Sequence, residues 1–286
     1  MMKPELDVEL EKFRKTLGSA LSEGGTQPLL RLTDEELAIL DPESIQECIA
    51  PTPHLMKMEA EERDWALATA LRSLVSRQVV EVSNIGELDA LMRSDESSQT
   101  TLSRRPVDVD MRITPEVSLA LTLRRTSSRA LAAEQHTSSG LAHAFVYVHA
   151  DDLYLVERVT AGGLHMFTLA STARDAAELV QLLVDPFDVA DKDGPVELLE
   201  PEHLNEGRLN GPLNDTINNA LVVGQIVALA DAPGPLLTTY ATDKVVWTVF
   251  VEKPNAPTGI QSRSVGSTTL HQMIAELVEP PARASH

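Results

Sequence analysis

The chain has 286 residues, of which 43% are hydrophobic, so it can bury the core of one large domain or of two closely packed halves. Its 43 acidic and 24 basic residues give a formal net charge of -19, which repels phosphate backbones and anionic membrane surfaces, so we expect no nucleic-acid partner. Cys48 is the single cysteine, no early segment has the pattern of a signal peptide, and no apolar run approaches the roughly 20 residues that cross a bilayer, so we expect a cytoplasmic protein without membrane insertion.

The first third of the chain has mainly helical patterns. Apolar residues three and four positions apart predict an N-terminal helix over residues 5–22, which Gly24 and Gly25 end. Thr33 and Glu36 have the spacing of a capping box and predict the start of a second helix. The strongest amphipathic pattern covers residues 59–78, with Trp65 beside its apolar face, and we expect this helix to be buried.

These patterns divide the N-terminal part into an N-terminal helix over residues 1–24, a helical region over residues 25–92 and a linker over residues 93–116. The linker is rich in serine and threonine and has no periodicity. Strand patterns begin only near Val117.

Strands dominate the rest of the chain and fall into two sets. The first set covers residues 118–123, 142–148, 153–159 and 164–169, and the second covers residues 221–229, 236–242, 245–251 and 260–265. Each set ends with a Ser-Thr pair that opens an apolar helix, and each helix is followed by a proline. The run Leu-Val-Glu-Arg at residues 155–158 is echoed by Phe-Val-Glu-Lys at residues 250–253.

This recurrence predicts an α+β fold with a pseudo-twofold body of two antiparallel strand-rich units, each closed by a C-terminal helix. The units would span residues 117–186 and 219–280, joined by an acidic connection over residues 187–218 and followed by a disordered tail over residues 281–286. Convergence of common strand–turn–helix patterns, without a true repeat, is the alternative.

No catalytic signature occurs in the chain. A phosphate-binding loop, a nucleophile elbow and an H-E-x-x-H helix are all missing from the sequence. His143 and His149 lie roughly 20 Å apart along one predicted strand, too far to share a metal ion. The acidic residues before Gly194 approach a calcium loop, but Val189 occupies its first ligand position. We therefore expect a protein that is not an enzyme, with no catalytic residues, cofactor or metal site.

Five residues are candidates for contact with a protein partner. Arg124, Arg125 and Arg129 gather in a predicted long connection over residues 124–140, and loops on a rigid scaffold commonly carry function. Phe145 and Tyr147 share one face of a predicted strand, where they either contact a partner or lie under the chain's own helices. Glutamate at the three arginine positions is expected to weaken partner binding without changing stability.

Several segments resemble a known family in type and order. They are the helical run at residues 70–77, the Arg-Ala-Leu-Ala-Ala run at 129–133, the strand pair over 146–156, the helix end at 182–186 and the Lys-Val-Val-Trp strand at 244–247. Over roughly residues 35–278 the chain is similar to the EspG-type chaperones of ESX (type VII) secretion. Gln78 replaces the family's usual glycine, and the N-terminal helix looks like an addition.

The resemblance implies a pseudo-twofold α+β protein that binds secreted PE-PPE heterodimers, or related small helical cargo, in the cytoplasm and escorts them to the secretion system. An uncharacterised ligand-binding domain or enzyme that uses the cleft between the two repeated units is the alternative function. The absence of catalytic motifs from the sequence favours the chaperone.

Overall fold

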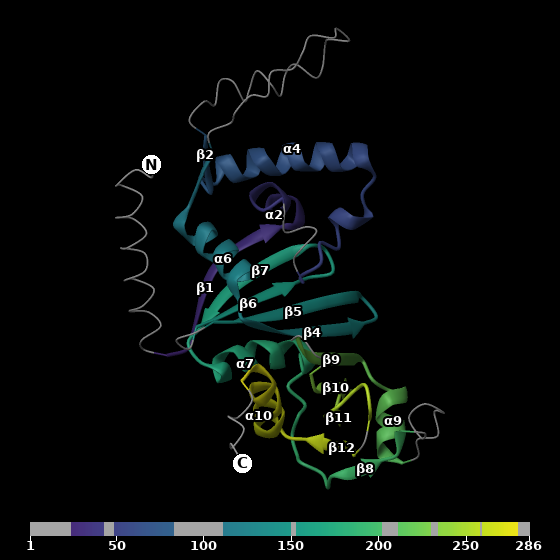
Figure 1. Cartoon of the computed structure of the whole chain (residues 1–286). Helices are drawn as coiled ribbons and strands as arrows, with labels where there is room; N and C mark the ends of the chain where they lie inside the picture. Colours follow the sequence, from purple (N-terminus) through teal and green to yellow (C-terminus); the bar gives the residue numbers. More distant parts are fainter. Residues whose placement is uncertain are drawn as a thin grey trace.

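A ten-stranded antiparallel sheet forms the centre of the computed structural model, which describes residues 24–42, 49–82, 111–149, 153–201, 211–229, 234–257 and 259–279 (Figure 1). Its strands are β1 (Thr26–Thr33), β4 (Arg129–Thr137), β5 (Gly140–Val148), β6 (Tyr154–Val159), β7 (Leu164–Ala170), β8 (Glu197–Leu199), β9 (Val222–Leu229), β10 (Leu236–Ala241), β11 (Val246–Val251) and β12 (Ile260–Val265). A separate two-stranded sheet pairs β2 (Val80–Val82) with β3 (Met111–Ile113).

The helices are α2 (Asp34–Leu40), α4 (Ala60–Ser76), α6 (Pro115–Thr126), α7 (Ala173–Val184), α9 (Pro212–Asn218) and α10 (Ser267–Val278), with a 3-10 turn, η1 (Leu55–Lys57). None of the helices within the described ranges is both long enough and apolar enough to cross a membrane. The expected mixed α+β class with an antiparallel sheet is confirmed.

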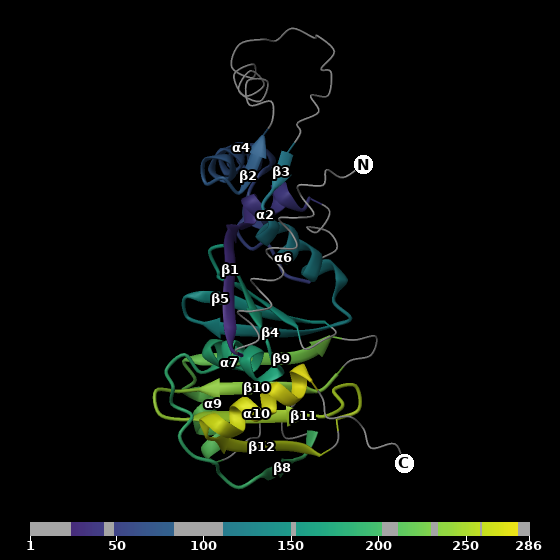
Figure 2. The ribbon, with the colours of Figure 1, turned by 90° about the vertical axis from the view of Figure 1, so that its left-hand side faces the viewer.

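The large sheet contains two four-stranded meanders that meet in its middle. Its strand order is β1-β7-β6-β5-β4-β9-β10-β11-β12-β8. The meander β4 to β7 is followed by α7, and the meander β9 to β12 is followed by α10. The two meanders join where β4 pairs with β9, and the outer strands β1 and β8 extend the sheet beyond β7 and β12 (Figure 2).

Helices cover both faces of the sheet, and its central strands are therefore buried on both sides. Along β5, Ala144 and Val146 face a core shared with α7 and α10. Phe145 and Tyr147 face the opposite core, shared with α2, α4 and α6. On that second face, a smaller core joins α9 to β11 through Leu213 and Trp247.

Capping fixes the start of α2 as the sequence predicts. The amide of Glu36 donates to the Thr33 hydroxyl, and the Thr33 amide donates to the Glu36 carboxylate, both at 3.2 Å. The Glu36 carboxylate thereby satisfies a free N-terminal amide, and its negative charge lies at the positive end of the helix dipole.

The region over residues 25–92 is not wholly helical, as it also holds β1 and β2. Helix α4 lies where residues 59–78 predict it, but the structure buries only Ala70 and Leu74 on it and leaves Trp65 64% exposed. The expectation of a buried helix is therefore wrong.

The expected strand over residues 118–123 is helical and belongs to α6, which Pro115 opens at its first position. The expected connection over residues 124–140 is the end of α6 followed by β4. The acidic connection over residues 187–218 includes β8 and α9.

Three predictions lie wholly or mainly outside the described residues. They are the N-terminal helix over residues 1–24, the linker up to residue 110 and the tail over residues 281–286. The last residues of the expected linker form β3 and the start of α6.

Candidate functional site

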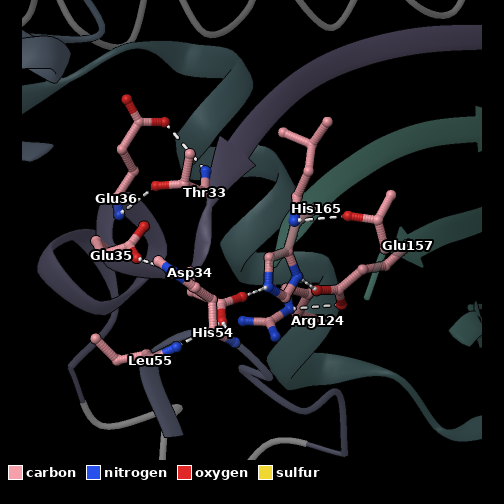
Figure 3. Close-up of polar contacts among 11 residues, drawn as sticks. Thr33, Asp34, Glu35, Glu36, His54, Leu55, Arg124, Glu157 and His165 are labelled. Atoms are coloured by element: carbon pink, nitrogen blue, oxygen red, sulfur yellow. Dashed lines mark hydrogen bonds and ion pairs between the residues drawn. The ribbon is translucent and has the colours of Figure 1, made fainter. Parts of the chain in front are cut away.

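A cluster of buried ionisable side chains links α2 to the sheet (Figure 3). Asp34, Glu157 and His165 have no exposed surface. His165 lies between the two carboxylates, with its Nε2 2.8 Å from Asp34 Oδ1 and its Nδ1 2.6 Å from Glu157 Oε1. A histidine bonded through both ring nitrogens to carboxylates is the doubly protonated imidazolium, because both nitrogens must then donate.

Two arginines and a tyrosine complete the cluster. Arg124 Nε donates to Glu157 Oε2 at 2.9 Å, and the Tyr147 hydroxyl donates to the same oxygen at 2.7 Å. Arg124 Nη1 lies 3.6 Å from Asp41 Oδ2, and Arg125 also pairs with Asp41. With His165 protonated, three cations balance three carboxylates, so the burial of these charges is compensated.

Sheet pairing brings these distant residues together. Strand β1 pairs with β7, which sets Thr33 opposite Leu164 and starts α2 beside His165. Strand β6 carries Glu157 next to β7. Asp34 Oδ2 also accepts the backbone amides of His54 at 2.6 Å and Leu55 at 3.0 Å, so one carboxylate holds η1, α2 and β7.

The tight turn before β7 also depends on a close approach between Gly163 and Asp34. Gly163 has a φ of +76°, and a Cβ on this residue would lie 2.7 Å from Asp34 Oδ2. Glycine at this position therefore permits both the left-handed backbone and the contact between the turn and α2.

The cluster shifts two pKa values in opposite directions. Burial alone lowers the pKa of His165, but hydrogen bonds to Asp34 and Glu157 and the charges of both carboxylates outweigh burial, so its pKa is raised. Burial alone raises the pKa of Glu157, but His165, the Arg124 charge and the Tyr147 hydroxyl outweigh burial, so its pKa is lowered. Both shifts favour the ion pair.

Complete burial decides what this cluster can do. A catalytic acid or base must reach a substrate within hydrogen-bonding distance, and the three central side chains are closed off from solvent. The arrangement therefore stabilises the packing of the helical layer on the sheet.

A second feature is a partly exposed area of the sheet, which we call the sheet strip. It lies on β4, β9 and β10, on the face that α7 and α10 do not cover. Its side chains are Glu134, His136, Val223, Gln225, Val227, Leu236 and Thr238. Strand register places Glu134 opposite Gln225, and Gln225 opposite Thr238.

Polar contacts run along one side of the sheet strip. Glu134 Oε2 lies 3.4 Å from His136 Nε2, and Glu134 Oε1 lies 3.8 Å from His143 Nδ1. Burial lowers the pKa of His143, although the Glu134 charge opposes this shift. The sheet strip thus presents a carboxylate and an imidazole beside aliphatic side chains, a mixed chemistry typical of protein interfaces.

The expected units, over residues 117–186 and 219–280, meet along one strand pair and along a groove between their last helices. The units join edge to edge through the hydrogen-bonded pair β4 and β9. A groove of about 570 Å³ lies between α7 and α10, the helices that follow the two meanders, and is lined in part by Arg174, His271 and Glu276.

The five sequence candidates for partner contact do not form one surface. Arg124 and Tyr147 belong to the buried cluster, and Phe145 is buried in the core under α6. The Arg125 side chain is 46% exposed, and Arg129 donates to the Leu277 carbonyl at 2.5 Å. Arg124, Phe145 and Tyr147 are therefore closed to a partner in this structure, and the interpretation that places the two aromatic residues under the chain's own helices fits.

Sequence reasoning missed Asp34, Glu157 and His165 because residues far apart along the chain form the cluster. One signal was present. Glu157 lies in the predicted strand directly after the apolar run Leu155-Val156, and a charged residue inside a buried strand requires a partner.

Within the residues that the structure describes, no group of three or more His, Cys, Asp or Glu side chains is placed to hold a metal ion. No known protein-family model matches the chain, and a search of curated proteins gives no match.

Proposed function

We propose that the chain is a cytoplasmic binding protein that escorts small helical secreted cargo, such as a PE-PPE-like heterodimer, to an ESX (type VII) secretion system. The observation that carries the proposal is the sheet strip, a half-exposed sheet face of mixed chemistry between helices. The sequence resemblance to EspG-type chaperones supplies the class of cargo.

The sheet strip suits the tip of a helical cargo. Its aliphatic residues Val223, Val227 and Leu236 offer apolar contact, while Gln225 and Thr238 offer hydrogen bonds. An escort must cover an apolar surface of its cargo and later release it, and an interface of mixed polarity with few buried ion pairs allows both.

The arrangement of the strands supports an origin by duplication as part of the same proposal. Each half has a four-stranded meander followed by one helix, and each carries one further strand at its outer edge. We infer that the two units are related by a pseudo-twofold axis near the β4–β9 pair.

Arginine at an exposed position of the sheet strip tests the proposal. Gln225→Arg adds a bulky charge to the strip and should reduce co-purification of the cargo by about tenfold or more, as at a well-packed interface. The matched control is Gln261→Arg, because Gln261 is also an exposed strand residue but belongs to β12, outside the sheet strip. The chain is co-expressed with small helical secreted proteins encoded by neighbouring genes.

Loss of the cargo with Gln225→Arg but not with Gln261→Arg supports the proposal, provided that both variants keep the wild-type melting temperature. Equal recovery of the cargo with both variants contradicts the role of the sheet strip. Failure of every such protein to co-purify with the wild type contradicts the escort function itself.

A ligand-binding function is a second candidate, because of one histidine in the groove between α7 and α10. His271 lines this groove, and its buried Nε2 has no hydrogen-bond partner among the described residues. A small molecule with a polar group could satisfy that nitrogen. Such a ligand would raise the melting temperature of the wild type but not that of His271→Phe.

A further inference from the structure

A groove of about 430 Å³ lies between α2 and α4, at the end of the molecule away from α10 (Figure 1). Its apolar lining comes from α4 and the segment before it, and includes Trp65, Ala66 and Met58. Its polar lining comes from α2 and its surroundings, and includes Glu35, Glu36 and His54. The groove is separate from the sheet strip.

Large apolar side chains are exposed on and beside this groove. Trp65 is 64% exposed, and Met56, in the η1 turn between the groove residues His54 and Met58, is 71% exposed. Trp247, the other tryptophan, is only 8% exposed and belongs to a core. Tryptophan and methionine are enriched at protein interfaces, since they offer a large contact area and, for methionine, an adaptable shape.

The charges of the groove select the kind of partner. Neither lysine nor arginine is among the described residues that line it, whereas Glu35 and Glu36 are. Arg77 pairs with Glu36 at 2.8 Å, but Glu35 is held by the half-exposed His54 at 2.6 Å. Burial alone raises the pKa of Glu35, yet hydrogen bonds from Thr33 and His54 lower it overall, so this carboxylate is ionised at neutral pH.

We propose that this groove binds a segment of another protein that presents apolar side chains next to lysine or arginine. The apolar side chains would pack on Trp65 and Met58, and the cation would reach the Glu35 carboxylate and the face of the indole ring. The inference does not rest on the escort function, because the groove and the sheet strip are built from different elements.

Charge also argues against a second copy of this chain as the occupant. Each copy of the chain carries a formal net charge of -19, and the resulting repulsion opposes association of two copies. A basic and apolar segment is instead attracted by the negative charge of the chain.

Three fluorescent synthetic peptides of about 12 residues, enough for three helical turns, test the proposal at about 0.15 M salt. The first peptide carries leucine and lysine on one helical face. The second has glutamate in place of lysine, and the third has serine in place of leucine. Fluorescence anisotropy gives each Kd, and we expect the first peptide to bind at least about tenfold more tightly than the other two.

Two variants locate the binding site. Trp65→Ala should weaken binding of the first peptide by about tenfold, and Glu35→Gln should weaken it by about three- to tenfold, because both contacts lie in the groove. The matched control is Leu198→Ala, which removes another exposed apolar side chain, 74% exposed, on the distant strand β8. This control should leave the Kd unchanged, and the melting temperature of each variant checks its folding.

Equal binding of the first and third peptides, or an unchanged Kd for Trp65→Ala, would mean that the peptide responds only to net charge and would overturn the proposal. No binding of the first peptide at millimolar concentration would overturn it as well. Dimerisation of the free protein that Trp65→Ala abolishes would assign the groove to a second copy, which also contradicts the proposal.

Discussion

His165 Nε2 lies 2.8 Å from Asp34 Oδ1, and this contact joins strand β7 to the first residue of α2 across 131 positions of sequence. The same Asp34 carboxylate accepts two backbone amides at the start of η1. One buried ion pair therefore fixes where the helical layer sits on the sheet.

Replacement of His165 should strongly destabilise the fold. In His165→Gln, both N–H donors of the amide lie on one nitrogen, so they cannot span the two buried carboxylates as the two ring nitrogens do, and the compensating positive charge is lost. Removing one partner from a buried ion pair typically costs about 3–5 kcal/mol in the free energy of unfolding. Urea denaturation measures this loss.

The matched control for that variant is His136→Gln, since the His136 side chain is 50% exposed and lies outside the buried cluster. Surface substitutions usually change stability by no more than about 0.5 kcal/mol. Equal stability of the two variants would show that the buried ion pair does not hold the fold.

Stability should depend on pH with opposite signs at the two ends of the range. The raised pKa of His165 means that its contribution is fully present below its unfolded value of about 6.5 and is lost as pH rises through the higher folded value. The lowered pKa of Glu157 means that its contribution is present above its unfolded value and is lost as pH falls through the lower folded value.

Urea denaturation from acidic to alkaline pH gives the unfolding free energy at each pH and tests this dependence of stability on the two pKa values. The wild type should lose stability as pH rises from about 6.5 to the folded pKa of His165, because the unfolded state releases this proton first, and His165→Gln should lack this part of the dependence. An identical alkaline slope in both proteins would assign the slope to other groups.

Two neighbouring arginines should differ in their effect on stability. The Arg124 side chain is 1% exposed and pairs with Glu157, whereas the Arg125 side chain is 46% exposed. Arg124→Met leaves a buried carboxylate uncompensated and should cost about 3–5 kcal/mol in thermal or urea unfolding. Arg125→Met should cost less, because the Arg125 side chain is half exposed and Asp41 keeps Arg124 as a second cation.

This pair of variants also revises an expectation from the sequence. Glutamate at Arg124 would add a negative charge beside Glu157, so the stability of the triple glutamate variant should fall and loss of cargo by that variant would not locate a contact. Equal melting temperatures for Arg124→Met and Arg125→Met would contradict the difference in burial.

Much of the second half of the chain could be predicted from its sequence. Strands β5 to β7 and β9 to β12 follow runs rich in valine, leucine and aromatic residues, and the Ser-Thr pairs mark the region where α7 and α10 start. These signals are local, because strand alternation and helix capping each depend on a few neighbouring residues.

The rest depended on contacts that lie far away in sequence. Strand β4 begins with Arg129 and three alanines among its next four residues, a composition with weak strand preference, and it is fixed by pairing with β5 and β9. Residues 118–123 alternate like a strand, but Pro115 and Glu116 start a helix that packs on the sheet. The ion pairs of Asp34, Glu157 and His165 could not be predicted for the same reason.

The last prediction concerns Asp193, which caps α10 from a distant segment. Its carboxylate accepts the Gly266 amide at 2.9 Å and the Thr269 hydroxyl at 2.7 Å, while Gly266, at the helix N-cap, has no side chain for this role. The bond from the Gly266 amide is the main reason that the pKa of Asp193 is lowered. Asp193→Ala should therefore lower the unfolding free energy by about 1 kcal/mol at neutral pH, as loss of a cap usually does.

The matched control for Asp193→Ala is Asp191→Ala, since the Asp191 side chain is 76% exposed and two residues away in the same acidic segment. The difference in melting temperature between these two variants should shrink as pH falls through the folded pKa of Asp193, because the protonated carboxyl is a weaker acceptor. Equal effects of the two substitutions at neutral pH would mean that the segment stabilises α10 through its overall charge, not through the Asp193 cap.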